Sequence, residues 1–464
     1  MKIIAQINTM AELDTSLQHA QSLDAADPLA SFRDRFWIPE SDGQQQIYLV
    51  GNSLGLQPKN VATVVTEELE KWQKLGVRGH FESDRPWLPY HEFLTPMMAK
   101  IVGAQEDEVV VMNTLTANLH LMMATFYRPT KTRNKILIES HAFPSDFQAV
   151  ESQIKLQGFD PKETIVTAVH GAESELLSED AICNLIEQHR DTLALILLPG
   201  VQYYTGQFLD MKRVAAMAHR FNISVGFDLA HAVGNVPLKL HDWDVDFAVW
   251  CNYKYINSGP GAVGGCFIHQ RHASDKTLPR MAGWWGHDKT TRFQMENRFD
   301  PIPTAEGWQL SNPPILSLAA ILASLQVFED AGGMDPLREK SLKLTGYFES
   351  LLKELLGDRV NIITPRVPDQ RGCQLSIEVV TGNVPGKEIH KQLEEAGTDT
   401  DWREPNVIRA APVPLYNSFE DVHRFVTTLK QIVDPQVPAR RASECVCMHG
   451  SLAGASGWCW RSVH

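Results

Sequence analysis

The feature that most constrains the fold is an alternation of short apolar segments with longer helix-like segments between about residues 46 and 270. The apolar segments have the length of buried strands, and those between them carry apolar residues at helical spacing. This alternation favours an α/β fold with a mostly parallel sheet and helices on both faces. We expect strands at 108–112, 135–139, 193–198, 224–227, 247–251 and 262–268, with helices at 118–126, 145–157, 179–190 and 211–221.

The pattern changes after residue 315 and predicts a smaller α+β domain. Its expected elements are a helical region at 315–356, strands at 361–364, 373–378 and 407–410, and helices at 386–396 and 421–433. An amphipathic segment at 8–26 predicts a helix that joins this domain. The expected organisation is therefore an N-terminal helical segment (1–45), a large domain (46–314), a small C-terminal domain (315–434) and a disordered tail (435–464).

Composition excludes several classes of function. The 464 residues include 43 Lys and Arg against 56 Asp and Glu, for a formal net charge of −13. An acidic chain without basic clusters argues against a nucleic-acid or membrane-surface partner. The longest apolar run, 193–198, is too short to span a bilayer, and the N-terminus lacks the apolar region of a signal peptide. We expect a soluble, cytoplasmic protein.

The seven cysteines are few and unevenly spread, which favours free thiols in a reducing compartment over a disulfide scaffold. Three of them, Cys445, Cys447 and Cys459, lie in the last twenty residues together with His449. Their spacing does not reproduce the paired C-x2-C pattern of zinc sites, so we expect no metal. The surrounding segment is rich in Gly, Ser and Ala and has no periodicity, which is typical of disorder.

Polar residues follow several of the expected strands. Asp228 ends one strand, Lys254 closely follows another, Ser145 and Asp146 follow a third, and Thr116 follows a fourth where a helix begins. In an open parallel sheet, ligands bind beyond the carboxyl ends of the strands. We therefore expect these side chains to meet at one edge of the sheet.

The segment WCNYKYINSGPG places Lys254 between two tyrosines after a buried strand. Taken alone, this pattern equally describes a surface lysine. A lysine held among aromatic rings also suits the imine-forming amine that anchors pyridoxal phosphate. Likewise, Asp228 either caps the helix that follows it or pairs with the cofactor's pyridinium nitrogen.

The string GPGAVG at 259–264 matches the G-x-G-x-x-G pattern of dinucleotide-binding loops. That motif requires a strand before it and a helix after it, so that the pyrophosphate meets the helix N-terminus. Here the next residues, GCFIHQ, predict a strand. The context therefore excludes a dinucleotide site.

Ten segments in one order resemble the kynureninase family of fold-type-I pyridoxal-phosphate enzymes, which are related to class V aminotransferases. The resemblance covers about residues 30–433. The segments are YLVGNSLGLQP, NTLTANLHL, AFPSDFQAVESQ, GVQYYTGQ, VGFDLAHAVGNVPL, HDWDVDFAVWCNYKYIN, GWWGHD, LSNPPIL, RGCQLSI and RAAPVPLYNS.

The resemblance implies a cofactor site in the large domain and at a homodimer interface. Lys254 matches the family's Schiff-base lysine, Asp228 the carboxylate at the pyridine nitrogen, and Tyr253 a phosphate-contacting tyrosine and proton donor. In isolation, His231 is also compatible with core packing, Ser145–Asp146 with a helix cap, and Trp284 with packing against Trp285. The other implied cofactor-binding residues are Leu115, Thr116, Phe143, Ser145, Asp146 and His231 and, from the second subunit, Trp284 and Asn312.

On the substrate side, Arg409 matches the arginine that holds the α-carboxylate, a bidentate contact that suits a guanidinium. At Pro199 the chain departs from members that carry a serine. The residues that match the pocket around the substrate's aryl group are Ser53, His80, Ser311 and Asn312.

The resemblance implies hydrolysis of L-kynurenine to anthranilate and L-alanine, or of 3-hydroxykynurenine to 3-hydroxyanthranilate and L-alanine, in tryptophan degradation or NAD biosynthesis. One alternative is a class V aminotransferase or cysteine desulfurase, but Cys251, Cys266 and Cys373 lie in or beside expected strands rather than in a mobile loop. Another is an inactive homologue retained for binding, which the intact Lys254 and Asp228 argue against. Because His80 and Asn312 can each hydrogen-bond a phenol, we expect 3-hydroxykynurenine to be preferred.

Overall fold

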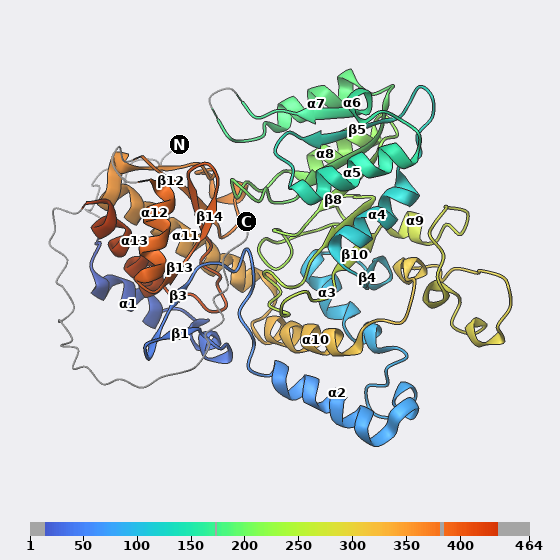
Figure 1. Cartoon of the computed structure of the whole chain (residues 1–464), viewed down its shortest axis with the longest axis horizontal. Helices are drawn as coiled ribbons and strands as arrows, with labels where there is room; N and C mark the ends of the chain where they lie inside the picture. Colours follow the sequence, from blue (N-terminus) through green and yellow to red (C-terminus); the bar gives the residue numbers. More distant parts are fainter. Residues whose placement is uncertain (1–13, 172–173, 381–384, 435–464) are drawn as a thin grey trace, which may run out of the picture.

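The computed structural model describes residues 14–171, 174–380 and 385–434, so the expected tail lies outside the described residues. A seven-stranded sheet with its covering helices forms the larger part of the molecule, and a four-stranded sheet forms the smaller part (Figure 1). The strands of the large sheet are β4 (Val109–Val111), β5 (Lys135–Glu139), β6 (Ile165–Ala168), β7 (Leu193–Pro199), β8 (Ser224–Asp228), β9 (Phe247–Trp250) and β10 (Gly265–Ile268).

The large sheet has the strand order β4-β10-β9-β8-β7-β5-β6. Strands β5 to β9 pair in parallel, whereas β10 runs antiparallel to both β9 and β4. The mostly parallel α/β fold expected from the sequence is confirmed, with one reversed strand. The reversal follows from the connection between β9 and β10, which contains no helix and turns the chain back directly.

Both faces of the large sheet are buried, and alternate residues of a strand enter different cores. In β7, Leu195 and Leu197 pack on one face, while Ile196 and Leu198 pack on the other. The first face is covered by α4 (Leu115–Phe126) and α5 (Pro144–Leu156). The opposite face is covered by α3 (Thr95–Val102), α7 (Glu179–Gln188), α8 (Met211–His219) and α10 (Ile315–Asp330).

The helical region expected at 315–356 is two helices, α10 and α11 (Met334–Leu356), which form an angle of 77°. The break occurs at Gly332 and Gly333, whose φ angles of 84° and 81° favour glycine. α10 packs on α2 (Val61–Leu75) beside the large sheet (Figure 1). The expected domain boundary at residue 315 coincides with the start of α10. This helix packs with the larger part of the molecule rather than with the small domain to which it was assigned.

The four-stranded sheet is antiparallel, with the order β11-β12-β15-β14, and packs with α11, α12 and α13 around a separate core. α1 (Leu17–Ala25) packs on α13, and β3 (Ile47–Tyr48) pairs with β13 (Thr398–Asp399). The remaining bounds are β11 (Val360–Ile362), β12 (Leu375–Val379), β14 (Asp401–Arg403), β15 (Val407–Ala410), α12 (Gly386–Glu395) and α13 (Phe419–Val433).

Among the described residues, no single helix has the length and apolar composition needed to cross a membrane. The bent pair Ile315–Asp330 and Met334–Arg359 reaches that threshold only when the two are taken together.

Candidate active site

A cavity of about 180 Å³ lies where the carboxyl ends of β5, β7 and β8, the residues after β9 and the first turn of α4 converge. This is the edge at which an open α/β sheet binds ligands. The residues that line the cavity are Leu115, Thr116, Glu139, Phe143, Ser145, Asp146, Pro199, Val201, Tyr203, Asp228, Ala230, His231, Tyr253 and Lys254.

Lys254 lies in the turn that follows β9, with its Nζ 3.0 Å from Nε2 of His231. The same nitrogen lies 6.0 Å from the centre of the Phe143 ring and 5.9 Å from that of Tyr253. Two backbone hydrogen bonds fix the turn: Gly55 N donates to the Tyr253 carbonyl, and Asn257 N donates to the Lys254 carbonyl. The amine is therefore held at a defined position on the cavity wall.

Asp228 and His231 approach the same cavity from the end of β8. Asp228 Oδ1 accepts a 2.7 Å hydrogen bond from the backbone N–H of Ala230, which orients the carboxylate. Burial, followed by the nearby Lys254 charge, lowers the pKa of His231 well below its usual value. The imidazole is therefore neutral at pH 7 and accepts a hydrogen bond from the lysine amine.

Two further carboxyl groups lie close to Asp228. Burial raises the pKa of Glu139 to about 8. Burial and the charge of Asp228 raise the pKa of Asp146 well above its usual value. Polar atoms of Glu139 (Oε2), Asp146 (Oδ1) and His231 (Nδ1) are buried and have no hydrogen-bond partner. Such a group of acids and unpaired atoms suits a cationic heterocycle that carries a ring N–H.

At the other end of the cavity, the first turn of α4 lies beside α5, and Thr116 Oγ1 is 2.8 Å from Ser145 Oγ. The N-cap residue Thr114 gives α4 no side-chain cap, which leaves its first N–H groups available to a ligand. Gly264 approaches this turn so closely that a Cβ there would lie 3.2 Å from Leu115 N. Helix N-termini of this kind bind phosphate.

These features fit pyridoxal phosphate, the cofactor implied by the sequence. The first turn of α4 would suit its phosphate, the Lys254 amine its aldehyde, and the acids around Asp228 its ring nitrogen, while the Phe143 ring lies 6.0 Å from the amine. Pro199 also lines the cavity, where its side chain offers no hydrogen bond.

Arg409 on β15 lies at the junction of the two sheets and is almost completely buried. Its Nη1 donates to the carbonyl of Tyr203 at 2.7 Å, and its Nη2 lies 2.7 Å from Oδ2 of Asp401. Ser53 donates a hydrogen bond to the same carboxylate. Although burial opposes it, the Arg409 guanidinium lowers the pKa of Asp401. The arginine is thus positioned beside the cavity.

Apart from Ser53 and Arg409 beside it, four predicted site residues do not line the cavity of a single chain. His80 Nδ1 lies 3.0 Å from the Val77 carbonyl, and Trp284 donates to the Arg292 carbonyl. The other two, Ser311 and Asn312, lie exposed before α10.

Three residues near the site were not predicted from the sequence: Glu139, Tyr203 and Asp401. Glu139 ends β5 and could have been found by the rule that located Asp228. Tyr203 lies within GVQYYTGQ but had no assigned role. Asp401 pairs with Arg409 across strands β14 and β15, and no sequence signal indicates that pairing.

The cysteines of the described ranges do not reach the cavity surface. Cys251, Cys266 and Cys373 are buried, Cys183 is partly buried, and none of the four lines the cavity. Burial also raises the pKa of Cys251, which disfavours the thiolate. This placement agrees with the sequence argument against a cysteine desulfurase.

Solved structures share this fold. Cysteine desulfurase CsdA from Escherichia coli has a TM-score of 0.70 and 16% identity, with 88% of this chain and 98% of that chain covered. Cysteine desulfurase from Thermococcus onnurineus NA1 has a TM-score of 0.69 and 18% identity, with 84% and 95% covered. Fold and cavity together fit the class of fold-type-I pyridoxal-phosphate enzymes.

Residues 337–429 match the family model described as kynureninase C-terminal domain. The chain is 56% identical over 411 residues to kynureninase from Xanthomonas campestris pv. campestris (strain B100), with 89% of this chain and 96% of that protein covered. It is 52% identical over 417 residues to kynureninase from Koribacter versatilis (strain Ellin345), with 90% and 97% covered. The chain belongs to the kynureninase family.

Proposed function

We propose that this protein is a pyridoxal-phosphate enzyme that hydrolyses L-kynurenine to anthranilate and L-alanine, or 3-hydroxykynurenine to 3-hydroxyanthranilate and L-alanine. The proposal rests on one observation. In a chain 56% identical to a kynureninase, Lys254 and Asp228 line one cavity and Arg409 lies beside it. An amine, an acid and a guanidinium at these positions suit the cofactor aldehyde, its ring nitrogen and an amino-acid carboxylate. The reaction belongs to tryptophan degradation or NAD biosynthesis.

Bound pyridoxal phosphate supplies an aldehyde and an electron-accepting ring. The backbone at Leu115 and Thr116 would hold its phosphate, and Asp228 would keep a proton on its ring nitrogen. The Phe143 ring and His231 would enclose it, with Ser145 and Asp146 of α5 beside it.

The chain's own groups then position the substrate and move its protons. Arg409 binds the α-carboxylate, and Lys254 Nζ removes the proton from the α-carbon. Burial, together with the neighbouring Cys251, raises the pKa of the Tyr253 phenol well above its usual value. Tyr253 therefore keeps its proton at pH 7 and donates it to the β-carbon after water has added to the γ-carbonyl and the Cβ–Cγ bond has broken.

The test is an assay of the pyridoxal-phosphate-loaded protein with three substrates in parallel. Kynurenine should yield anthranilate, 3-hydroxykynurenine should yield 3-hydroxyanthranilate, and each should yield one equivalent of alanine. Cysteine should yield no sulfide. Sulfide release from cysteine, without cleavage of either kynurenine, would support the desulfurase alternative instead.

We further propose that the enzyme is a homodimer whose sites are completed by Trp284 and Asn312 of the partner chain. Large apolar side chains are exposed around these residues and around His80, and unpartnered apolar surface of this kind marks protein interfaces. Ser53, His80, Ser311 and Asn312 would then surround the aryl group. The exposed apolar residues are Trp72, Val77, Phe81, Met281, Trp284, Phe293 and Met295.

The proposed compartment is the cytoplasm, and neither a nucleic-acid nor a membrane partner is proposed. The four cysteines of the described ranges are free, and the net charge is −13. Unpaired thiols suit a reducing compartment. Fractionation of cells that produce the full chain should recover the kynurenine-cleaving activity in the soluble cytoplasmic fraction.

A further inference from the structure

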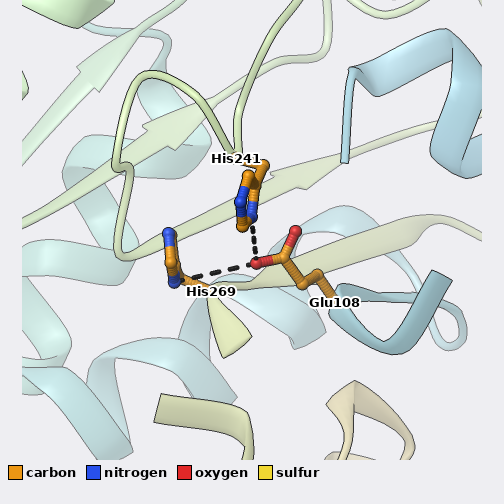
Figure 2. A group of neighbouring side chains, drawn as sticks. All are labelled: Glu108, His241 and His269. Atoms are coloured by element: carbon orange, nitrogen blue, oxygen red, sulfur yellow. Dashed lines mark hydrogen bonds and ion pairs between the residues drawn. The ribbon is translucent and has the colours of Figure 1, made fainter. Parts of the chain in front are cut away.

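A glutamate and two histidines meet at the edge of the large sheet opposite the cofactor cavity (Figure 2). Glu108 directly precedes β4, His241 lies in the loop before β9, and His269 follows β10. Because β10 is antiparallel to its neighbours, the start of β4, the start of β9 and the end of β10 lie at one edge. The other ends of these strands lead to Leu115 and Lys254 in the cavity.

The three side chains bring one possible ligand atom each into a small volume. Nδ1 of His241 lies 2.9 Å and Nδ1 of His269 lies 3.7 Å from Oε1 of Glu108, and all three atoms lie within 4.8 Å of one another. Four ligands around tetrahedral zinc, with bonds of about 2.1 Å, lie about 3.4 Å apart. The observed distances of 2.9 Å and 3.7 Å lie on either side of this ligand–ligand distance.

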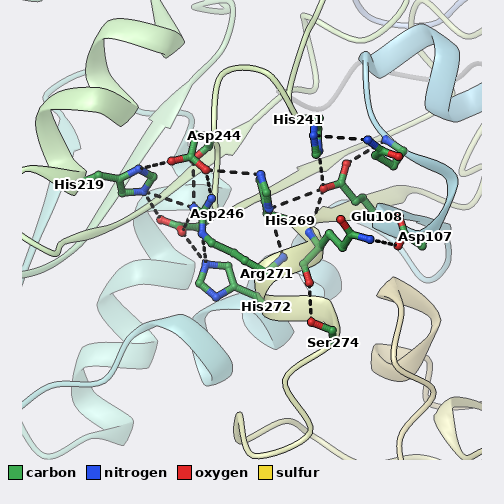
Figure 3. Close-up of polar contacts among 12 residues, drawn as sticks. Asp107, Glu108, His219, His241, Asp244, Asp246, His269, Arg271, His272 and Ser274 are labelled. Carbon is green, nitrogen blue, oxygen red and sulfur yellow. Dashed lines mark hydrogen bonds and ion pairs between the residues drawn. The ribbon is translucent and has the colours of Figure 1, made fainter.

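The imidazole of His269 is already in the tautomer that a metal at Nδ1 requires. The backbone N–H of Arg271 donates to Nδ1 at 3.3 Å, so this nitrogen carries a lone pair rather than a proton, and an ion would take that lone pair in place of the hydrogen bond. The proton is therefore on Nε2, which lies 3.4 Å from Oδ1 of Asp244 (Figure 3). A carboxylate behind a ligating histidine is the usual outer partner in zinc sites because it fixes the ring and raises its basicity.

His241 is the adjustable ligand of the group. Its ring is nearly parallel to that of His269, with an interplanar angle of 17°. One ion can lie in the planes of both rings only if the His241 ring turns. The side chain is 31% exposed and is held by the 2.9 Å contact with Glu108 and a longer one with Gln105. A metal ion at this point takes the place of the proton between His241 Nδ1 and the carboxylate.

Glu108 is completely buried, and the structure gives it no lysine or arginine partner among the described residues. Its two oxygens accept hydrogen bonds from the backbone N–H groups of Gln105 and Gln270. These bonds fix the carboxylate without supplying a full positive charge. A cation beside Oε1 would supply that charge, since a buried carboxylate is strongly stabilised by an opposite charge.

A second group of possible ligands consists of His91, Glu92 and Glu306. Unlike Glu108, its carboxylates have a lysine partner. Lys289 Nζ lies 2.9 Å from a carboxylate oxygen of each glutamate, and His91 lies 2.8 Å from Glu306. The ammonium of Lys289 therefore already occupies the position between the two carboxylates that a metal ion would take.

We propose that Glu108, His241 and His269 form a binding site for a divalent transition-metal ion of the zinc type. Two imidazole nitrogens and one carboxylate oxygen suit zinc and its neighbours, whereas magnesium and calcium prefer all-oxygen sites. The exposed side of His241 leaves the fourth position to water. The ion would join β4, β9 and β10 at the edge remote from the cavity, and its role would be structural.

The test uses the full-length, pyridoxal-phosphate-loaded enzyme with Cys445, Cys447 and Cys459 replaced by serine, so that tail thiols do not bind zinc. Zinc alone is added, excess is removed by dialysis, and bound metal is measured by elemental analysis and by competition with a chromophoric chelator. We expect about one zinc per chain and a higher melting temperature with zinc than without it.

Two substitutions remove one ligand each. His241→Gln changes a partly exposed side chain, and His269→Asn retains an acceptor for the N-terminal cap of α9 (Gln270–Ala273). Each should weaken zinc binding at least about tenfold and abolish the zinc-dependent rise in melting temperature, while kynurenine cleavage without zinc is unchanged. His189→Gln, a histidine change outside the group, should bind zinc as the parent does.

Asp244→Asn tests the outer partner, because asparagine also adopts the positive φ of 59° found at this position. It should weaken zinc binding by about tenfold. The proposal is overturned if the parent binds no zinc, or if folded His241→Gln and His269→Asn variants bind zinc as tightly as the His189→Gln control.

Discussion

At the scale of single residues, the proposed covalent anchor is Lys254, which lines the same cavity as Asp228 and lies 3.0 Å from His231. Replacing Lys254 with alanine should lower kcat at least about a hundredfold, because the variant lacks the base that moves the α-proton. Borohydride should also no longer fix the cofactor to the chain. The matched control is Lys100→Ala, a change at an exposed lysine that pairs with Glu329. A folded K254A enzyme with substantial turnover would show that another amine is the anchor.

Glu139 should impose a pH dependence on the stability of the cofactor-free protein. Its pKa is about 8 in the folded chain and near 4.5 when unfolded, so between these values the folded state binds the extra proton. Stability should therefore fall as pH rises from about 5 to 8, by roughly 1 kcal/mol per pH unit, and level off above 8. Urea unfolding of wild type and Glu139→Gln across this range measures the effect. An equal slope in both proteins would contradict the assignment.

Substrate choice is also decided by single side chains. If His80 and Asn312 contact the aryl group, their polar atoms would be left unpaired by a substrate without a hydroxyl. That loss costs about 1–3 kcal/mol, so kcat/KM should favour 3-hydroxykynurenine by roughly ten- to a hundredfold. The double variant His80→Phe, Asn312→Thr should bring the ratio of the two kcat/KM values toward one. A wild-type ratio at or below one would argue against these contacts.

At the scale of elements, the phosphate site depends on how closely β10 approaches the start of α4. A Cβ on Gly264 would lie 2.6 Å from the Trp250 carbonyl and 3.2 Å from Leu115 N. Gly264→Ala should therefore cost about 1–3 kcal/mol of stability and weaken cofactor binding. The control is Gly346→Ala in the middle of α11, where nothing lies within 4 Å and alanine should stabilise the helix by about 0.5–1 kcal/mol. Urea unfolding and cofactor titration check both variants.

The sequence predicted the elements better than their directions. β5 has the expected bounds, because an apolar run between polar residues marks a buried strand. The direction of β10 was not predicted, since an apolar run does not specify it. The four-residue strand β6, at the sheet edge, was missed. The break between α10 and α11 was also missed, because apolar residues recur at helical spacing on both sides of Gly332 and Gly333.

In the candidate site, too, only part of the arrangement could be predicted from the sequence. Lys254 and Asp228 could be located because they follow strands in one sheet, and topology brings such positions together. Asp401 could not, because its contact with Arg409 depends on pairing between two strands of the small sheet. Trp284 and Asn312 lie outside the cavity of a single chain, so a sequence cannot place them by sheet topology alone.

At the scale of the whole molecule, the proposed dimer predicts that two inactive variants can restore activity to each other. Lys254→Ala lacks the anchor, and the double variant Trp284→Ala, Asn312→Ala lacks the groups offered to the partner's site. In a mixed dimer, one site would combine an intact Lys254 with intact Trp284 and Asn312. Random exchange of equal amounts makes half of the dimers mixed, so about one quarter of wild-type activity should return.

The control for this experiment pairs Lys254→Ala with Asp228→Ala. Both residues line one cavity within a single chain, so neither site of that mixed dimer is complete and no activity should return. Mass spectrometry of the native protein verifies that subunits have exchanged. Full activity of the Trp284→Ala, Asn312→Ala variant on its own, or no recovery in a verified mixed dimer, would show that each chain completes its own site. Recovery with the first pair alone would place the active site at the interface, where the exposed apolar surface around Trp284 becomes buried.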